Sequence, residues 1–496
     1  MAPVHRLSPE EGEDLRMGST SDFSRRDLIK RAAALGIVTV PAMSALSACA
    51  SSGDGGGEKV EKGEKSAKNP LAVNDSAALD VVIFDGGFGD KYAKDAQAEY
   101  VAAFPKTKGK VKLASTQKIQ STLQPRFNGG NPPDLVDNSG AEQMDFGTLV
   151  SKNQLADLTP LLDAPSMDDP NKKVRDTLRP GVVEMGQFGG KETWIMYYAY
   201  TVYGVWYSKT NLKKVADAEY PETWEEMLAV CEKAKKKGVA GWTYPGKYPY
   251  YLPFSLYPFI AKIGGAEVLR KIDNLEPNAW KDPAVKAAFD AYYELYKKGY
   301  VLKGSPGLDH LQSQKAWAEG KALFIPNGSW VENESAQQIE KNPDFQLSVG
   351  APSSLSGSDK MPFGTIWASG GEPYIVPRQA KNVPGGMEML RIMLSKKSSQ
   401  NFIKQVSSLT SLNGGTEGLK LPPGLDSAQQ ALEQAGKNIV NPRIQDWYVA
   451  LQKEKIGVGA LGEMMAGRMT PDEAINKIQK YADETREDSS VKKYQR

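Results

Sequence analysis

The sequence has little of the two side chains on which metal sites and acyl-transfer chemistry most often depend. Its 496 residues include two cysteines, Cys49 and Cys231, and two histidines, His5 and His310. Zinc sites and Ser-His or Cys-His catalysis draw their ligands and bases from these residue types. We therefore predict no metal, no cofactor and no catalytic residues, and no disulfide between Cys49 and Cys231.

The chain also lacks a strong excess of either charge. Its 62 Lys and Arg nearly balance 60 Asp and Glu, for a net charge of +2. Proteins that bind nucleic acid or hold a membrane by charge carry a basic patch or stripe, so neither partner is expected. With 40% hydrophobic residues, 496 residues exceed one ordinary core, which predicts two domains or a two-lobed body.

The first 48 residues have the pattern of an export address. Arg25 and Arg26 precede an apolar stretch from Ala32, and the segment 46–49 reads "LSAC". These features resemble a twin-arginine signal and a lipoprotein lipobox, so 1–48 is predicted to be a signal and Cys49 the lipidated residue.

The other interpretation of this segment is an uncleaved membrane anchor, although Thr39, Pro41 and Ser44 interrupt its apolar stretch. Met1 and Met17 both remain possible starts. Residues 49–76, rich in Gly, Ser, Lys and Glu, are predicted to be a flexible tether.

The folded part begins with alternating strand and helix patterns. We expect strands at 79–84, 110–114 and 134–137, a helix at 90–104, and later helices capped by Thr223, Asp282 and Thr470. This order is typical of a mostly parallel sheet with helices on both faces. Ligands collect at the carboxyl ends of such strands, here at Gly86, Gly87, Asn138 and Ser139.

Four stretches carry a family resemblance: "VYGVWYSKTNLKK" at 202–214, "PETWEEM" at 221–227, "AEGKALFIPNGSW" at 318–330 and "GGEPYIVPRQAKN" at 370–382. Their order and spacing resemble the extracellular solute-binding proteins of carbohydrate ABC importers, of the maltose-binding type. The signal and "MPFGTIWASGGEPYIVP" at 361–377 look like the actinobacterial group that binds N-acetylglucosamine and N,N'-diacetylchitobiose.

The resemblance implies an α/β, two-lobed, type II periplasmic-binding-protein-like fold. Each lobe would have a mostly parallel sheet with flanking helices, and crossing strands would join the lobes beside a ligand cleft. The expected boundaries are 77–198 with 346–398 for lobe 1, 199–345 with 399–486 for lobe 2, and 487–496 for a polar tail.

The resemblance further implies a monomer that captures an amino sugar or short oligosaccharide by lobe closure. It would deliver this carbohydrate to the transmembrane subunits of an ABC permease while a lipid holds it on the outer face of the cytoplasmic membrane.

Sugar binding needs aromatic platforms and fixed polar groups, and two runs, 194–207 and 242–259, are dense in aromatics. Because strands alternate their faces, about half of the first run is expected to be core. The family places a sugar-stacking tryptophan at the position of Trp330 and a second one at Trp447. The predicted ligand-binding residues are Trp330, Trp447, Trp367, Asn138, Gly87, Phe88, Trp242, Tyr200, Asn327 and Gly370.

Each of these assignments has a structural alternative. Trp330 could be a helix-start residue packed on its lobe, and Trp447 an ordinary core contact. Trp367 lies in a Gly/Ser-rich segment that we interpret as a loop, which favours a place in the cleft. Asn138 could supply hydrogen bonds to hydroxyl or acetamido groups.

Two rival functions remain. A lipid-anchored glycoside hydrolase would need two carboxylates across one bond, and the loop acids that could serve are Asp85, Asp137, Glu332 and Glu372. The second is a binder of another solute, such as a polyamine, a peptide, a phosphate ester or another oligosaccharide. The acidic box or convergent basic groups that a polyamine or a phosphate requires are not visible in the linear sequence.

Overall fold

The computed structural model describes residues 59–496, which surround one mixed β-sheet. The predicted signal 1–48, Cys49 and the first part of the tether, through residue 58, lie outside the described residues. None of the helices within 59–496 has both the length and the apolar character that crossing a bilayer requires.

The main path of the sheet follows the order β2-β1-β3-β8-β4-β6-β5. The strands are β1 (Leu79–Phe84), β2 (Val111–Thr116), β3 (Leu135–Asp137), β4 (Met196–Ser208), β5 (Ala240–Trp242), β6 (Ala322–Gly328), β7 (Leu347–Gly350), β8 (Ile366–Ile375), β9 (Leu409–Thr410) and β10 (Ile439–Val440). The first three fall where the sequence predicts them, within two residues at each end.

The direction of pairing differs between the ends and the middle of this sheet. Strand β1 runs parallel to β2 and β3, and β5 runs parallel to β6, as expected for each lobe. In the middle, β4 pairs antiparallel with β6, β7, β8 and β9, and β3 pairs antiparallel with β8. The sheet is therefore mixed rather than mostly parallel, because β4 and β8 cross the molecule in opposite directions.

Strand β4 is the longest of the described strands, and all its 13 residues are buried. Its sequence, MYYAYTVYGVWYS, is rich in the aromatic and β-branched residues that favour strands. It pairs with β8 from Met196 opposite Tyr374 to Tyr203 opposite Trp367. Burial on both faces explains why the run shows no alternation of apolar and polar residues.

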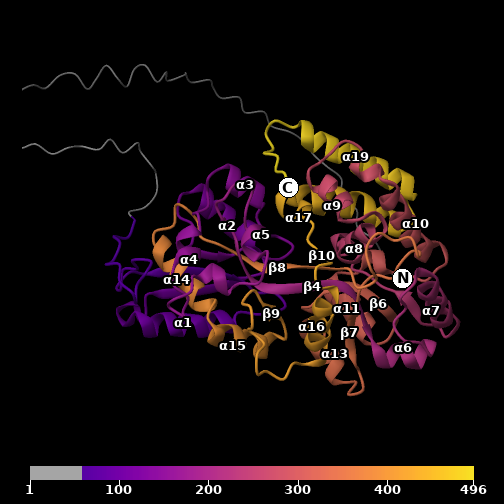
Figure 1. Cartoon of the computed structure of the whole chain (residues 1–496), viewed down its shortest axis with the longest axis horizontal. Coiled ribbons are helices and arrows are strands. Elements are labelled where there is room, and N and C mark those ends of the chain that lie inside the picture. The colour runs from indigo at the N-terminus through magenta and orange to yellow at the C-terminus, as the bar shows by residue number, and fades with distance from the viewer. Residues whose placement is uncertain (1–58) are drawn as a thin grey trace, which may run out of the picture. The chain divides into compact units, whose positions relative to one another are not determined.

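Helices cover both ends of the sheet (Figure 1). Their bounds are α1 (Lys91–Ala103), α2 (Ile119–Asn128), α3 (Phe146–Ser151), α4 (Thr159–Asp163), α5 (Val182–Met185), α6 (Lys209–Ala216), α7 (Trp224–Lys236), α8 (Pro253–Gly264), α9 (Ala266–Asp273), α10 (Pro283–Lys297), α11 (His310–Ala318), α12 (Val331–Glu334), α13 (Ala336–Glu340), α14 (Val383–Met393), α15 (Lys396–Val406), α16 (Pro423–Ala435), α17 (Ile444–Trp447), α18 (Gly462–Met465) and α19 (Pro471–Glu487).

Segments far apart in the sequence share these layers. Helix α14, orange in Figure 1, lies beside the indigo α1 and packs on β1 and β3. At the other end of the sheet, α7 packs on β5 and α11 packs on β6. The end of the sheet that carries β1 and β3 is thus completed by chain that returns after β8.

The predicted helix caps are confirmed. The Thr223 hydroxyl accepts a hydrogen bond from the Glu226 N–H, and the Glu226 carboxylate accepts one from the Thr223 N–H, which forms a capping box. Asp282 caps α10 ahead of Pro283, and Thr470 caps α19. Cys231 is fully buried in α7, as its place in the apolar pattern predicts.

Both ends of the described chain pack on the fold more closely than a tether and a polar tail would. Val73 is buried in the core, and the Val60 N–H donates to the Lys381 carbonyl at 3.0 Å. Near the other end, Tyr494 is 2% exposed, because its ring packs against Phe188. Apolar side chains such as Val73 and Tyr494 therefore anchor the two segments, although the composition of each is mostly polar.

Candidate functional site

A cavity of about 580 Å³ lies at the carboxyl ends of β1 and β3. The loop after β1 contributes Gly86–Phe88, and the loop after β3 contributes Ser139–Gln143. Further lining residues come from the segment after β2, from β4, β8, α8, α11 and α12, and from the segments 248–251 and 445–453. A concave site of this size, drawn from many segments, suits a small organic ligand.

Five aromatic residues, the aromatic set, form one part of the lining: Tyr203, Tyr250, Tyr251, Phe254 and Trp330. Tyr250 and Tyr251 lie in a short 3-10 helix, η3 (Pro249–Tyr251), directly before α8. The Trp330 ring meets Tyr203, Tyr251 and Phe254 edge to face, with centroids 5.7, 5.9 and 5.7 Å away. Edge-to-face contacts on several sides fix the orientation of the indole.

The chain around Trp330 allows the indole to fold back over its own strand. Trp330 directly precedes α12, and β6 ends at Gly328. A Cβ on Gly328 would stand 2.2 Å from the Trp330 ring, so only glycine fits there. Trp330 is therefore both a helix-start residue and a cavity residue, which unites the two interpretations of its motif.

Four acid groups, the carboxylate set, lie at or beside the cavity: Asp137, Glu334, Glu372 and Asp446. The Ser139 hydroxyl lies between two of them, 3.0 Å from Glu372 Oε2 and in hydrogen-bond contact with Asp137. Glu372 has φ 48°, a left-handed conformation that is unusual for a residue other than glycine. Such local strain gathers at functional sites.

Burial shifts the pKa of every member of the carboxylate set upward. It raises the pKa of Asp137 to about 6, that of Asp446 to about 6 and that of Glu334 to about 7. Burial, and then the charge of Asp137, hold the pKa of Glu372 well above its usual range. Desolvation penalises the ionised form, so these groups keep protons that exposed carboxylates would lose.

Two polar contacts cross the cavity. The Asn333 amide, in α12, donates to the Gly87 carbonyl in the loop after β1. The Lys453 ammonium, in the π-helical segment η6 (Leu451–Leu461), donates to the Ala141 carbonyl at 2.8 Å. Burial lowers the pKa of Lys453 to about 8. These contacts join the segments that follow β1 and β3 to segments from later in the chain.

Four of the predicted binding residues lie on the cavity lining: Trp330, Gly87, Phe88 and Gly370. A Cβ on Gly87 would stand 2.9 Å from the Glu334 side chain, so glycine permits the close approach of the two segments. The Phe88 ring packs edge to face on Phe402, with centroids 5.2 Å apart.

Trp367 does not line the cavity, and the interpretation of its segment as a loop is wrong. It lies in β8, where β4 on one side and β10 on the other complete its hydrogen bonds. The indole is fully buried and stacks on Tyr203, with centroids 4.5 Å apart. Because Tyr203 belongs to the aromatic set, Trp367 supports that set from behind.

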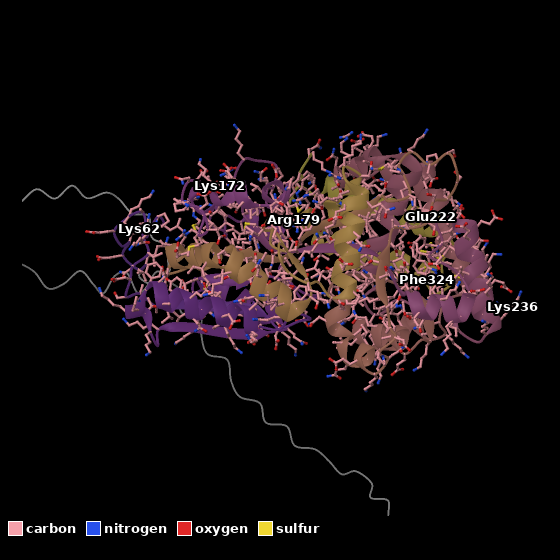
Figure 2. The ribbon with its side chains drawn as sticks, turned by 60° about the horizontal axis from the view of Figure 1, so that its bottom comes forward. Lys62, Lys172, Arg179, Glu222, Lys236 and Phe324 are labelled. Carbon is pink, nitrogen blue, oxygen red and sulfur yellow. The ribbon has the colours of Figure 1, made fainter. Side chains whose placement is uncertain are left out.

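Tyr200 is on the face of β4 opposite the cavity. Tyr197, Thr201 and Tyr203 line the cavity at odd positions of the strand, whereas Tyr200 lies under the Arg179 guanidinium, 5.3 Å from its ring centroid. Figure 2 shows Arg179 near the middle of the molecule, where its Nε donates to the Thr410 carbonyl at 3.0 Å.

Trp242 and Asn327 also lie off the cavity lining. Trp242, in β5, packs on Tyr292 and on Phe324, the latter labelled in Figure 2. The Asn327 carbonyl accepts a hydrogen bond from the Trp206 indole at 3.0 Å. Both side chains are buried, and neither lines the cavity.

Asn138 and Trp447 adjoin the cavity without lining it. The Asn138 amide donates to the Met144 carbonyl at 3.0 Å and accepts from the Met144 N–H at 2.9 Å, which holds the loop 139–143 against the cavity. Trp447 is buried against Tyr494 and Arg443, whereas its neighbour Asp446 lines the cavity.

Several lining residues could not be singled out from the sequence. Tyr250, Tyr251 and Phe254 lie in the second aromatic run, but nothing in the sequence indicated which of its rings face a ligand. Glu334, Asp446 and Lys453 carried no signal, because only the fold brings their distant segments together. Alternation along β4 predicts that Tyr200 and Tyr203 lie on opposite faces of the strand, but it does not say which face borders the cavity.

The four acids proposed for hydrolysis do not face one another across the cavity. Only Asp85 lies in a loop, as expected for all four; the others belong to β3, α12 and β8. Glu372 and Asp137 share the Ser139 hydroxyl on one side, Glu332 accepts the N–H groups of Gly424 and Leu425, and Asp85 is exposed. Among residues 59–496, no group of three or more His, Cys, Asp or Glu side chains could hold a metal ion.

Comparison with known proteins places this geometry in context. Residues 74–400 match the family model of the bacterial extracellular solute-binding proteins. The chain is 35% identical over 487 residues to the diacetylchitobiose binding protein NgcE of Streptomyces coelicolor, which covers 97% of this chain and 99% of that protein. It is 25% identical over 324 residues to the multiple sugar-binding protein of Streptococcus mutans, covering 63% of this chain and 70% of that one.

Solved structures share the fold. A chitin oligosaccharide binding protein aligns with a TM-score of 0.64 at 22% identity, over 81% of this chain and 98% of that chain. The apo form of RafE from Streptococcus pneumoniae aligns with a TM-score of 0.61 at 17% identity, over 82% and 98%. These similarities agree with two α/β lobes joined by crossing strands.

Proposed function

The chain belongs to the bacterial extracellular solute-binding protein family, and we propose that it captures a short acetamido sugar for an ABC importer. N,N'-diacetylchitobiose and N-acetylglucosamine are the favoured ligands. The observation that carries the proposal is a single cavity in which the aromatic set and the carboxylate set lie together. The diacetylchitobiose binding protein of Streptomyces coelicolor supports the choice of sugar.

The two sets complement the two surfaces of a sugar. Faces of C–H bonds stack on aromatic rings such as Trp330. Hydroxyl and acetamido N–H groups donate hydrogen bonds, which the oxygens of Glu372 and Asp446 accept. An acid group left without such a donor in a buried site carries a desolvation cost, so sugars that lack the matching group are rejected.

Lobe closure is the proposed mechanism of capture. The lobes would be 77–198 with 346–398 and 199–345 with 399–486, and the ligand would bind more tightly to the closed form. Only this difference in affinity shifts the population toward closure. The contacts of Asn333 with Gly87 and of Lys453 with Ala141 would then hold the lobes together around the sugar for recognition by the permease subunits.

The proposal also includes a lipid anchor that holds the protein on the membrane. Export through the twin-arginine route and lipidation of Cys49 would keep a monomer on the outer face of the cytoplasmic membrane, near its permease. Two or three acyl chains hold stably where one does not. Cys49→Ser is expected to release the protein into the medium with its sugar affinity unchanged, measured by fractionation and titration. Retention of the variant in the membrane would contradict lipidation as the anchor.

Titration tests the binding function. Calorimetry and tryptophan fluorescence with N-acetylglucosamine, N,N'-diacetylchitobiose, maltose and xylobiose should give saturable binding of the two acetamido sugars and weaker or no binding of the others. No response to any carbohydrate would overturn the proposal. Release of N-acetylglucosamine from the disaccharide would instead favour the hydrolase alternative.

A further inference from the structure

A second hollow continues from the cavity over the surface of α11, α12 and α13. It encloses about 360 Å³ and shares Leu311, Asn333 and Glu334 with the cavity. Because the two hollows have three lining residues in common, a ligand in the cavity meets the second hollow directly at its rim. We call the second hollow the rim groove.

The lining of the rim groove suits a polar, extended ligand. Beyond the three shared residues, it is lined by Lys315 and by three glutamines, of which Gln337 and Gln338 lie in α13. Each glutamine amide offers two donors and an acceptor, so it can pair with either role of a sugar hydroxyl or acetamido group.

An apolar side chain marks the junction between cavity and groove. Leu311 is 52% exposed, more than any other large hydrophobic side chain in the described part of the chain. An exposed leucine loses contact with water when a ligand passes over it, which favours binding.

The groove is preformed. A capping box between Asp309 and Gln312 fixes the start of α11, and the Gln314 amide donates to Glu334 at 2.7 Å, which ties α11 to α12. A ligand that enters the groove therefore does not have to order these helices first.

We propose that the rim groove is a subsite for one further sugar unit, so that the chain takes an oligosaccharide longer than the disaccharide held in its cavity. This inference rests on the proposed function and specifies the length of its ligand. The added unit lies over Leu311 and hydrogen-bonds with Gln337 and Gln338, outside the aromatic and carboxylate sets.

Calorimetry on the purified protein with N,N'-diacetylchitobiose and with the corresponding acetylated trisaccharide tests the proposal. We expect the trisaccharide to bind about 3- to 10-fold more tightly, the gain of one or two extra hydrogen bonds. In the double variant Gln337→Ala/Gln338→Ala, the two sugars should bind equally, with the affinity for the disaccharide unchanged.

Gln429→Ala/Gln430→Ala is the matched control, because these two consecutive glutamines of α16 line neither the cavity nor the rim groove. It should keep the preference for the trisaccharide. Equal affinities in the unmodified protein, or a preference that survives in the α13 variant, would overturn the subsite while leaving disaccharide binding intact. Failure of both sugars to bind would overturn the proposed function and the subsite with it.

Discussion

The aromatic set is held in place by contacts between rings. The carboxylate set is instead held by hydrogen bonds, and burial favours the protonated form of its acid groups. Trp330 rests on three rings, none of which changes its charge near neutral pH. Glu334 and Asp446, by contrast, have pKa values raised to about 7 and about 6. The contribution of the aromatic set to sugar binding should therefore not depend on pH, whereas the carboxylate set should make the site sensitive to pH.

Removing the central ring of the aromatic set should have the largest effect. Trp330→Ala takes away a flat surface that three rings hold in position, and is expected to weaken sugar binding by about 1–3 kcal/mol, or about 5- to 150-fold, as for aromatic stacking on other flat ligands. Calorimetry at pH 7 measures the loss.

Trp447→Phe is the comparison variant, because Trp447 is a buried tryptophan off the cavity lining. It is expected to bind sugar within about twofold of the unmodified protein, a difference of less than 0.5 kcal/mol. Equal losses in the two variants would return Trp447 to the ligand-binding residues, and no loss in either would remove stacking from the mechanism.

Replacing one acid of the carboxylate set with its neutral amide should remove a pH dependence of stability. In the unfolded chain Glu334 ionises near its usual pKa, but in the folded protein it holds its proton to about pH 7. Between these values the folded state binds more protons than the unfolded state, so the contribution of Glu334 to stability falls as pH rises toward 7. Glu334→Gln should thus add on the order of 1–3 kcal/mol of unfolding free energy at pH 8 and almost nothing at pH 4.5.

Urea denaturation at the two pH values measures this difference. Glu340→Gln, at the exposed end of α13, is the matched control and should change stability equally at both. If Glu334→Gln behaves like this control, Glu334 is not desolvated and the carboxylate set is more open to water than its geometry indicates.

The sequence predicted the aromatic set better than the carboxylate set, for a physical reason. Strand β1, the capping box of α7, the two-lobed fold and the family resemblance were all predicted and are confirmed, because each depends on a local pattern or on a motif. Trp330 was found through such a motif, and it lies on the cavity lining.

The carboxylate set could not be predicted as a group, because its members lie on distant segments that meet only through tertiary packing. Asp137 and Glu372 were named only as candidate hydrolase acids, and Glu334 and Asp446 carried no signal. Local composition also gave a wrong prediction for the segment around Trp367. Glycine and serine around it suggested a loop, yet pairing with β4 on one side and β10 on the other makes the segment a strand. Local sequence carries no information about such partners.

Buried groups outside the cavity hold the segment that carries Asp446 in place. Removing one of them should have a smaller effect than the changes above. Asp273 is fully buried, and its Oδ1 accepts the N–H groups of Arg443 and Ile444 at the start of α17, the helix that carries Asp446. Its Oδ2 pairs with Arg496 at 2.5 Å. Arg496→Ala leaves a buried carboxylate short of a partner and should cost about 1–2 kcal/mol of stability, reduced from the value of a fully buried pair because Arg496 is partly exposed.

Urea denaturation measures that loss, with Lys480→Ala on the exposed side of α19 as the control. Sugar affinity should fall by less than about fivefold, since only the support of Asp446 is disturbed. A larger fall in affinity than in stability would mean that this support belongs to the binding site itself.

The smallest effect should come from a change far from both sets. Thr223 caps α7, which packs on β5 at one end of the sheet, and neither residue of its capping box lines the cavity. Thr223→Ala should cost about 1 kcal/mol of stability, the usual value of a helix cap, with sugar affinity unchanged. Thermal unfolding and calorimetry on the same preparation separate the two quantities. A parallel loss of affinity would mean that stability alone governs binding, and the contrast between the aromatic and carboxylate sets would then have no bearing on sugar recognition.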